Sequence, residues 1–244
     1  MEDQMKTVLI TGGSRGIGAA CVRKFADEGF AVAFFYNGSE DAARKVAEET
    51  GALAIKCDVS DNEAVRLGIA EACSHFSADA FDVIVCNAGI SVEGQIQDLT
   101  DEEWDRLSGV NLSGVINTVR ASVPGMISSK SGSIVIMSSM WGLSGASCEA
   151  AYSATKAAVI GLGQGLAKEL GPSGIRVNMV APGVIDTDMN KGRSPEDWNE
   201  ILADTPLGRV GKPEEVAELV FFLASEKAGF ITGQTIGIDG GFVV

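Results

Sequence analysis

Short, continuously apolar runs alternate with longer stretches of helical periodicity along the whole chain, and this pattern constrains the fold more than any other feature. Clear amphipathic helical stretches cover 16–28, 39–50, 61–76 and 152–170. Runs that are apolar at every position predict strands buried on both faces of a sheet, because a half-exposed strand would alternate apolar with polar residues. Seven such runs, rich in β-branched residues, occupy 7–10, 31–35, 53–56, 83–86, 133–137, 176–180 and 235–238.

Strand–helix alternation of this kind predicts an α/β fold, namely a Rossmann-type doubly wound parallel sheet of about seven strands with helices on both faces. The 244 residues show no low-complexity segment, linker or internal repeat, so we expect a single domain over 1–244. Ligands of such sheets bind at the carboxyl ends of the strands, around the point where the strand order reverses. The functional residues should therefore follow the apolar runs.

Composition and charge exclude several classes of protein. The chain has 19 Lys+Arg against 33 Asp+Glu, a net charge of −14, which is the opposite of the basic surface that nucleic acids or anionic membranes require. No run approaches the ~18 apolar residues of a membrane-spanning helix, and the acidic N-terminus does not resemble a signal peptide. Five widely spaced cysteines and the single His75 favour reduced thiols over disulfides or a zinc site. We therefore expect a cytoplasmic protein with no metal, nucleic-acid or membrane partner.

The segment TGGSRGIG, residues 11–18, follows the first apolar run and opens a helical stretch. Glycines at such a turn let backbone N–H groups approach a pyrophosphate at the helix N-terminus, whose partial positive charge favours the anion. A purely structural turn would look similar, but its place after the first strand favours a dinucleotide site. The cofactor contacts expected from this loop are Gly12, Ser14, Arg15, Gly16, Ile17 and Gly18.

The end of the second strand bears on the choice of cofactor. An acidic residue there usually binds the ribose 2′-hydroxyl of NAD, but residues 35–39 contain none, although Glu40 and Asp41 follow. Arg15 could pair with a 2′-phosphate, or it could be a solvated loop charge. We expect NADP(H) rather than NAD(H), with further contacts from Tyr36, Asn37 and Ser39.

A tyrosine and a lysine are four residues apart at the start of a predicted helix, which places Tyr152 and Lys156 on one helix face. A phenol titrates near pH ~10, and a neighbouring cation lowers that pKa, so such a tyrosine can exchange a proton with an alcohol or carbonyl oxygen. The spacing alone is a common accident of helices. Ser139, just past the fifth strand, adds a hydroxyl donor at the same rim and favours the functional interpretation.

Taken with Asn87-Ala88-Gly89, Asn111, Pro182-Gly183 and the terminal Ile231-Thr232-Gly233-Gln234, these motifs resemble the short-chain dehydrogenase/reductase family over essentially the full length. Within that family the chain is most similar to the 3-oxoacyl-[acyl-carrier-protein] reductase branch.

The resemblance implies a role for each catalytic candidate. Tyr152 would be the general acid, and Ser139 would hydrogen-bond the substrate oxygen. Lys156 would hold the nicotinamide ribose and lower the tyrosine pKa, and Asn111 would keep a water in a proton relay. Further cofactor contacts implied after the other strands are Asp58, Val59, Asn87, Ala88, Gly89, Pro182, Gly183, Ile185 and Thr187.

The same resemblance implies a homotetramer assembled through two long helices and the C-terminal segment. The predicted helix 152–170 carries small residues that would let another helix approach closely, although they could equally pack on the chain's own sheet. These residues are Ala154, Ala157, Ala158, Gly161, Gly163 and Gly165.

The substrate is less constrained. Relatives that dock an acidic acyl carrier protein commonly present arginines before the fifth and sixth strands, where this chain offers only Lys130 and Arg176. Glu149 stands where the branch often has Gln, and Trp141 is a bulky residue that could line the pocket or pack in the core.

Three hypotheses about function therefore stand. The protein is a fatty-acid-synthesis reductase with acyl carrier protein as a partner, an enzyme acting on a free small steroid, sugar or other alcohol, or a non-catalytic NADP-binding regulator. The joint presence of Ser139, Tyr152, Lys156 and Asn111 argues against the third.

Overall fold

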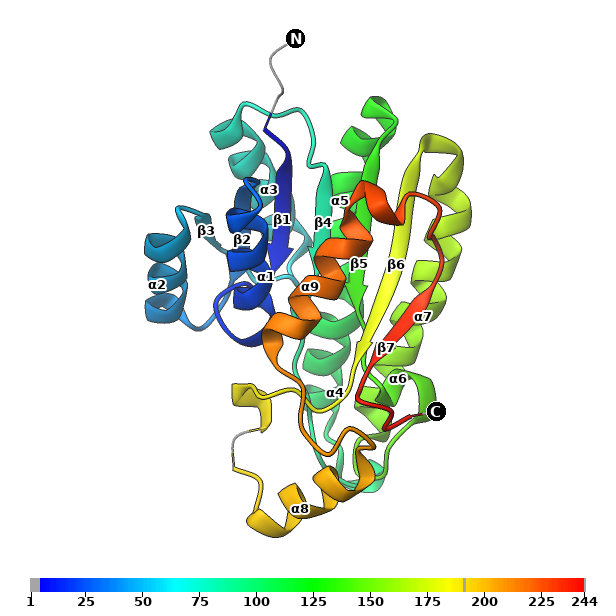
Figure 1. The fold of residues 1–244 in the computed structure, drawn as a ribbon. Coiled ribbons are helices and arrows are strands. Elements are labelled where there is room, and N and C mark those ends of the chain that lie inside the picture. The colour runs from blue at the N-terminus through cyan, green and yellow to red at the C-terminus, as the bar shows by residue number, and fades with distance from the viewer. Residues whose placement is uncertain (1–4, 191, 244) are drawn as a thin grey trace.

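The computed structural model describes residues 5–190 and 192–243, and in this part of the chain seven strands form one sheet with helices on both faces (Figure 1). The strand order is β3-β2-β1-β4-β5-β6-β7, and every neighbouring pair is parallel. This confirms the predicted doubly wound sheet. The strands are β1 (Thr7–Thr11), β2 (Ala31–Tyr36), β3 (Leu53–Lys56), β4 (Val83–Cys86), β5 (Gly132–Met137), β6 (Ile175–Pro182) and β7 (Thr235–Ile238).

The helices divide between the two faces of the sheet, which explains why the central strands are apolar at every position. Val8 and Ile10 of β1 point into the core on one face, and Leu9 points into the core on the other; all three are fully buried. The first face is covered by α1 (Gly16–Asp27), α2 (Glu40–Thr50) and α9 (Pro213–Ala224), and the second by α3 (Asn62–Phe76), α5 (Gly114–Ser129) and α7 (Ala150–Leu170).

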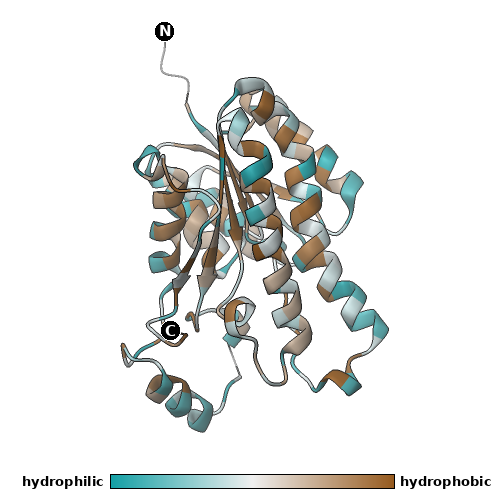
Figure 2. Cartoon of the chain, turned by 90° about the vertical axis from the view of Figure 1, so that its right-hand side faces the viewer, coloured by the Kyte–Doolittle hydropathy of each residue, from teal (hydrophilic) through white to brown (hydrophobic). Residues whose placement is uncertain are grey.

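Shorter helices lie near the carboxyl edge of the sheet. These are α4 (Asp101–Ser108), α6 (Trp141–Ser144) and α8 (Pro195–Asp204). In Figure 1 α8 lies farthest from the strands, and Figure 2 shows that this helix contains both polar and apolar residues. No residue of α8 is fully buried. The carboxyl edge of the sheet is therefore bordered by short helices that the strand–helix alternation in the sequence did not predict.

The element bounds differ from the predicted ones where local contacts decide them. β6 runs on to Pro182 because its last residues continue the pairing with β7, so Pro182 ends the strand instead of following it. The carboxylate of Asp61 accepts hydrogen bonds from the backbone N–H groups of Glu63 and Ala64, which makes Asp61 the N-cap and starts α3 one residue later. α7 begins at Ala150, two residues before Tyr152.

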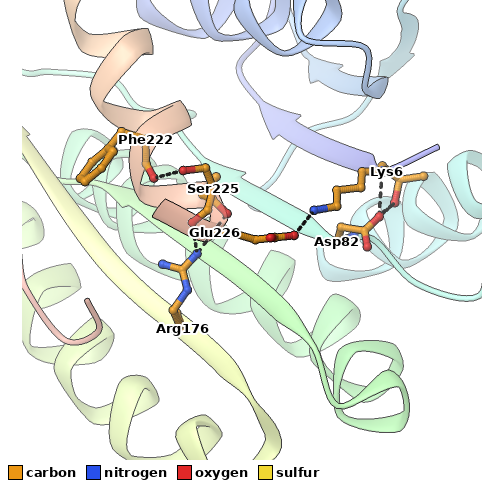
Figure 3. A network of polar contacts seen from close by, with 8 residues as sticks. Lys6, Asp82, Arg176, Phe222, Ser225 and Glu226 are labelled. Carbon is orange, nitrogen blue, oxygen red and sulfur yellow. Dashed lines mark hydrogen bonds and ion pairs between the residues drawn. The ribbon is translucent and has the colours of Figure 1, made fainter. Parts of the chain in front are cut away.

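Arg176 on β6 holds the end of α9 against the sheet. Its guanidinium donates hydrogen bonds to the carbonyl oxygens of Leu223 (2.6 Å), Ala224 (3.0 Å) and Ser225 (3.1 Å). Figure 3 shows Arg176 directed to Ser225 at the end of α9. The last carbonyls of a helix have no intrahelical donor, so a cation at this end satisfies them. Arg176 is half-buried, and its burial lowers its pKa. Its guanidinium is therefore not free to contact an acyl carrier protein, for which Arg176 was one of two candidate cations.

The thiols differ in burial. Cys21, Cys57 and Cys86 are buried, and burial is the main reason that the pKa of each rises to about 12. Cys148, in the loop before α7, is exposed. His75 lies exposed in the last turn of α3, with its ring against that of Phe76. Within the described residues, no helix has the length and apolar character needed to cross a membrane.

Candidate active site

A cleft of about 820 Å³ opens at the carboxyl ends of β1, β2, β4, β5 and β6, around the point where the strand order reverses. The structure brings all the predicted cofactor residues together in its lining. These are Gly12, Ser14, Arg15, Gly16, Ile17, Gly18, Tyr36, Asn37, Ser39, Asp58, Val59, Asn87, Ala88, Gly89, Tyr152, Lys156, Pro182, Gly183, Ile185 and Thr187. Ser139 also lines the cleft.

The glycine loop leaves a cradle that side chains would fill. Gly12 has φ +70° and Gly16 has φ +54°, a region that favours glycine. A Cβ atom on Gly18 would collide with the carbonyl oxygen of Gly12 and lie 2.6 Å from Nδ2 of Asn87. The open backbone and the N-terminus of α1 fit the pyrophosphate of a dinucleotide.

Asn87 braces this loop from the neighbouring strand. Its Nδ2 donates hydrogen bonds to the carbonyl oxygens of Thr11 (3.0 Å) and Gly12 (3.2 Å). In return, Oγ1 of Thr11 accepts hydrogen bonds from the backbone N–H groups of Asn87 and Ala88, both at 3.0 Å. The amide of Asn87 thus fixes the end of β4 to the loop after β1, a structural role beside the ribose contact that the resemblance implies.

The far end of the cleft is polar and fits the adenosine half of a dinucleotide. The carboxylate of Asp58 accepts hydrogen bonds from Oγ of Ser60 (2.7 Å) and Nδ2 of Asn37 (2.9 Å). The contacts with Ser60 are the largest cause of the lowered pKa of Asp58, and the positive charge of Arg106 adds to it. The Arg15 side chain is 64% exposed and lies 4.0 Å from the carboxylate of Asp188.

Three of the four catalytic candidates converge at the opposite end. Ser139 follows β5, while Tyr152 and Lys156 are one turn apart on α7, and all three are buried. The Ser139 hydroxyl interacts with the Tyr152 hydroxyl and lowers its pKa. Nζ of Lys156 lies 5.7 Å from the centroid of the Tyr152 ring and donates a hydrogen bond to the carbonyl oxygen of Met137 (3.0 Å). The tyrosine hydroxyl therefore has a hydroxyl partner and a nearby amine.

Burial dominates the titration of both residues on α7. It raises the pKa of Tyr152 to about 12, and the hydrogen bond with Ser139 offsets only part of this rise. Burial also lowers the pKa of Lys156 to about 8. Removal of the phenol from water therefore dominates the pKa of Tyr152 in this structure. That Lys156 lowers this pKa stays a prediction of the family resemblance. At neutral pH Tyr152 is protonated, as a proton donor must be.

Asn111 lies behind the cleft, on a π-helical turn, Gly109–Ser113, between α4 and α5. Its amide donates hydrogen bonds to the carbonyl oxygen of Ile90 (2.9 Å) and to Oγ1 of Thr155 (3.1 Å). A Cβ atom on Gly89 would lie 3.3 Å from Nζ of Lys156 and 3.4 Å from Oδ1 of Asn111. The space that this glycine leaves open thus lies next to both Lys156 and Asn111, the two residues of the proton relay that the resemblance implies. π-Turns often mark functional sites.

Sequence reasoning missed several lining residues. Ile90, Ser91 and Ser138 follow strands that had been identified, so their position alone could have indicated them. Asp105, Arg106 and Val110 come from α4 and the π-turn, and no apolar run pointed to that segment. The full set is Phe35, Gly38, Cys57, Ser60, Ile90, Ser91, Asp105, Arg106, Val110, Met137, Ser138, Asp188, Met189 and Asn190.

The doubly wound sheet, the glycine cradle and the buried tyrosine and lysine define a nicotinamide-dependent oxidoreductase. A family model described as enoyl-(acyl carrier protein) reductase matches residues 12–243. The 3-oxoacyl-[acyl-carrier-protein] reductase FabG of Staphylococcus aureus is 42% identical over 241 residues, which are 97% of each chain. The protein of the same name from Chlamydia trachomatis is 41% identical over 242 residues, covering 97% of this chain and 96% of that one.

Solved structures agree with these sequence matches. A variant of a short-chain dehydrogenase/reductase from Serratia marcescens superposes with a TM-score of 0.92 at 37% identity, covering 99% of both chains. A 3-oxoacyl-[acyl-carrier protein] reductase from Brucella melitensis gives a TM-score of 0.90 at 37% identity, covering 98% of this chain and 92% of that one. The chain belongs to the short-chain dehydrogenase/reductase family.

Proposed function

We propose that this protein is an NADPH-dependent reductase of 3-oxoacyl thioesters that acts in fatty acid synthesis. The observation that carries the proposal is the convergence of Ser139, Tyr152 and Lys156 at one end of a dinucleotide-sized cleft. The high identity to 3-oxoacyl-[acyl-carrier-protein] reductases over nearly the full chain supports the substrate class.

The side chains divide the reduction of a carbonyl among them. When bound, the cofactor supplies a hydride to the carbonyl carbon. Oγ of Ser139 donates a hydrogen bond to the carbonyl oxygen and stabilises the charge that develops there. The Tyr152 hydroxyl gives its proton to that oxygen, which completes the alcohol, and the nearby Lys156 stabilises the phenolate that remains. A water held by Asn111 in the space beside Gly89 would pass a proton from solvent to Lys156, which would return it to the Tyr152 phenolate.

NADPH is the proposed cofactor because the cleft segment 35–39 carries no carboxylate and the exposed Arg15 stands at its phosphate loop. A 2′-phosphate would draw the Arg15 side chain away from its distant contact with Asp188. Titration of both cofactors by fluorescence tests this. Tighter binding of NADPH, weakened in Arg15→Ser, is expected, and equal or tighter binding of NADH would contradict it.

The substrate assay compares an acetoacetyl thioester, the same group on acyl carrier protein, a 2-enoyl thioester and a panel of free ketones. We expect consumption of NADPH with the 3-oxoacyl thioester and none with the enoyl thioester, because the hydroxyl pair of Ser139 and Tyr152 is suited to a carbonyl oxygen. Turnover of the enoyl compound alone would instead support the activity in the family description.

A free small ketone is the second candidate substrate, and the surface charge favours it. Arg176 is occupied by the end of α9, so Lys130 alone remains of the two cations assigned to carrier docking, against a net charge of −14. We therefore expect the carrier to add little to kcat/KM, with little dependence on salt. A strong carrier preference that salt abolishes would show that a local basic patch outweighs the global charge.

The proposed assembly is a homotetramer that uses α7. Ala154, Ala157, Ala158, Gly161 and Gly165 form an exposed stripe of small residues on this helix, which supports close approach of another helix. Gly163 faces the chain's own sheet instead, where a Cβ atom would collide with Sδ of Met179. Light scattering that gave one 25.3 kDa chain per particle would refute the tetramer. A cytoplasmic location stays a prediction for cell fractionation.

A further inference from the structure

The amide group of Asn111 joins three segments of the chain. Its Nδ2 donates hydrogen bonds to the carbonyl oxygen of Ile90 (2.9 Å) and to Oγ1 of Thr155 (3.1 Å). Its Oδ1 accepts the backbone N–H of Ile90 (2.9 Å). Ile90 belongs to the loop after β4, Asn111 to the π-turn and Thr155 to α7. Asn111 and Thr155 are 1% and 2% exposed, so their contact is shielded from water, where an unpaired polar group is costly.

Thr155 makes a second hydrogen bond, within its own helix. Its hydroxyl donates to the carbonyl oxygen of Tyr152 at 2.8 Å, as a threonine in a helix often does with the preceding turn. The hydroxyl has a single hydrogen, so Oγ1 remains available as an acceptor and pairs with the NH₂ group of Asn111. Bonding back to the helix explains the first contact, but it does not explain why a distant asparagine is bound to the same oxygen.

These partners select one orientation of the Asn111 amide. A half-turn of an asparagine amide exchanges its acceptor atom, Oδ1, with its donor atom, Nδ2. The backbone N–H of Ile90 requires the acceptor, and Oγ1 of Thr155 requires the donor, so both partners favour the same orientation. Without the Thr155 hydroxyl, one N–H of Nδ2 would lose its partner in a buried position.

The selected orientation presents Oδ1 to the space beside Gly89. A Cβ atom on Gly89 would lie 3.3 Å from Nζ of Lys156, 3.4 Å from Oδ1 of Asn111 and 3.8 Å from the carbonyl oxygen of Asn87. One donor and two acceptors therefore border this space, and a bound water commonly makes about three hydrogen bonds to such groups. With Nδ2 in the place of Oδ1, the water would lose one of its two acceptors.

We propose that Thr155 is a positioning residue of the proton relay: its hydroxyl holds the amide of Asn111 so that Oδ1 faces the space shared with Lys156. The inference rests on the proposed function, because the relay returns a proton to Tyr152. Thr155 is not part of the described lining of the cleft, so it acts through Asn111 and not on the substrate. Loss of its hydroxyl should slow the return of the proton without changing how the cofactor binds.

Thr155→Val tests the proposal, since valine has the shape of threonine without the hydroxyl. We expect kcat to fall about five-fold or more, because a buried donor left unpaired lets the amide leave its orientation, while KM for NADPH stays the same. Thr155→Ala removes the same hydroxyl from a smaller side chain and should show the same fall. Thr155→Ser keeps the hydroxyl and should recover most of kcat.

Thr118→Val is the matched control. Thr118 is fully buried on α5, and its hydroxyl donates to the carbonyl oxygen of Gly114 in its own helix at 2.8 Å. The substitution therefore removes a buried threonine hydroxyl that is bonded back to a helix, as Thr155→Val does, but away from Asn111. Its kcat should match that of the wild type.

A double-mutant cycle separates positioning from a general loss of packing. Asn111→Ala removes the amide that Thr155 holds, so adding Thr155→Val to it should lower kcat by less than about two-fold further. Wild-type kcat in Thr155→Val would overturn the proposal. A full second loss in the double variant, or a Thr155→Ser variant as slow as Thr155→Val, would also overturn it, since packing would then explain the effect.

Hydrogen exchange gives a readout that does not require turnover. In protein labelled with [¹⁵N]asparagine, the side-chain NMR signal that is missing from Asn111→Ala belongs to Asn111. Its NH₂ protons should exchange with solvent at least ten-fold faster in Thr155→Val than in the wild type, and Thr155→Ser should stay close to the wild type. Equal exchange rates in the wild type and Thr155→Val would overturn the inference.

The failure of this inference and that of the proposed function are distinguishable. A wild-type protein that leaves every carbonyl compound unreduced refutes the proposed function, and hydrogen exchange still decides whether Thr155 holds Asn111. An active wild type whose exchange rates do not respond to Thr155→Val refutes the role of Thr155 alone.

Discussion

The two ends of the cleft present different kinds of atoms. The phosphate end is built mostly from backbone, on a loop whose glycines have positive φ or leave no room for a Cβ atom. The opposite end is built from side chains, namely Ser139, Tyr152 and Lys156, which come from two segments and are buried by their neighbours. The comparison teaches that a binding site formed by backbone can be recognised from a short local sequence motif. The pKa of a reactive side chain depends instead on packing by residues that are far away in the sequence.

The largest expected effect separates the two ends. Tyr152→Phe removes the proton donor and leaves the glycine loop untouched. Turnover should fall by at least ~10²- to 10⁴-fold, the range of general acid–base catalysis, while the dissociation constant of NADPH stays close to the wild type. Steady-state kinetics and fluorescence titration measure the two quantities. A near-normal rate would show that another group supplies the proton.

The reverse experiment acts on the phosphate end. Gly18→Ala places a Cβ atom against the Gly12 carbonyl and 2.6 Å from Nδ2 of Asn87, so the loop must shift. We expect the dissociation constant of NADPH to rise by more than about ten-fold and stability to fall by ~1–3 kcal/mol, as overpacking does elsewhere.

Gly94→Ala is the matched control for this substitution, because nothing lies within 4 Å of the added atom. Calorimetry and cofactor titration should leave that variant close to the wild type. Unchanged cofactor affinity in Gly18→Ala would show that the close approach of backbone is not what binds the phosphates.

Lys156 lies at the catalytic end, and its burial predicts a pH dependence of stability. Its folded pKa of about 8 lies below the ordinary 10.5, so between these values the unfolded state binds more protons and the free energy of unfolding rises with pH. Tyr152 has the opposite effect, but only above its ordinary value of 10.

The free energy of unfolding of the wild type should therefore rise by a contribution on the order of 3 kcal/mol over that window, and Lys156→Met should lack this contribution. Urea unfolding of both proteins between pH 8 and pH 10 measures the difference. Lys168→Met, at an exposed position of the same helix, should leave the slope as it is. A wild-type slope in Lys156→Met would show that the amine is solvated.

The smallest effect concerns the outer face of α7. In a single chain an added Cβ on Gly161 meets nothing within 4 Å, so alanine alone would stabilise the helix by about 1 kcal/mol. If a neighbouring subunit packs there, as proposed, Gly161→Ala should lower Tm and the assembled mass in light scattering instead. A higher Tm with unchanged mass would place the subunit contact elsewhere.

The same contrast decides how much the sequence could predict. All seven strands were predictable because burial on both faces requires continuous apolar runs. The dinucleotide cleft was predictable from the residues that directly follow these strands. The raised pKa of Tyr152 was not predictable, since the i, i+4 spacing indicates the nearby cation but not the exclusion of water.

Arg176 illustrates the same point. It looks like a surface cation until the end of α9, far along the chain, is placed on it. A contact between distant segments decides its role, and no local pattern encodes it.

The unequal burial of the thiols gives the protein a natural attachment point for chemical probes. Thiol reagents attack the thiolate, so Cys21 and Cys86, which burial keeps protonated, should react slowly with a maleimide. Cys148 is exposed and precedes Glu149 by one residue. A fluorophore placed there without any engineered cysteine would report movements of the loop before α7 while substrate enters the cleft.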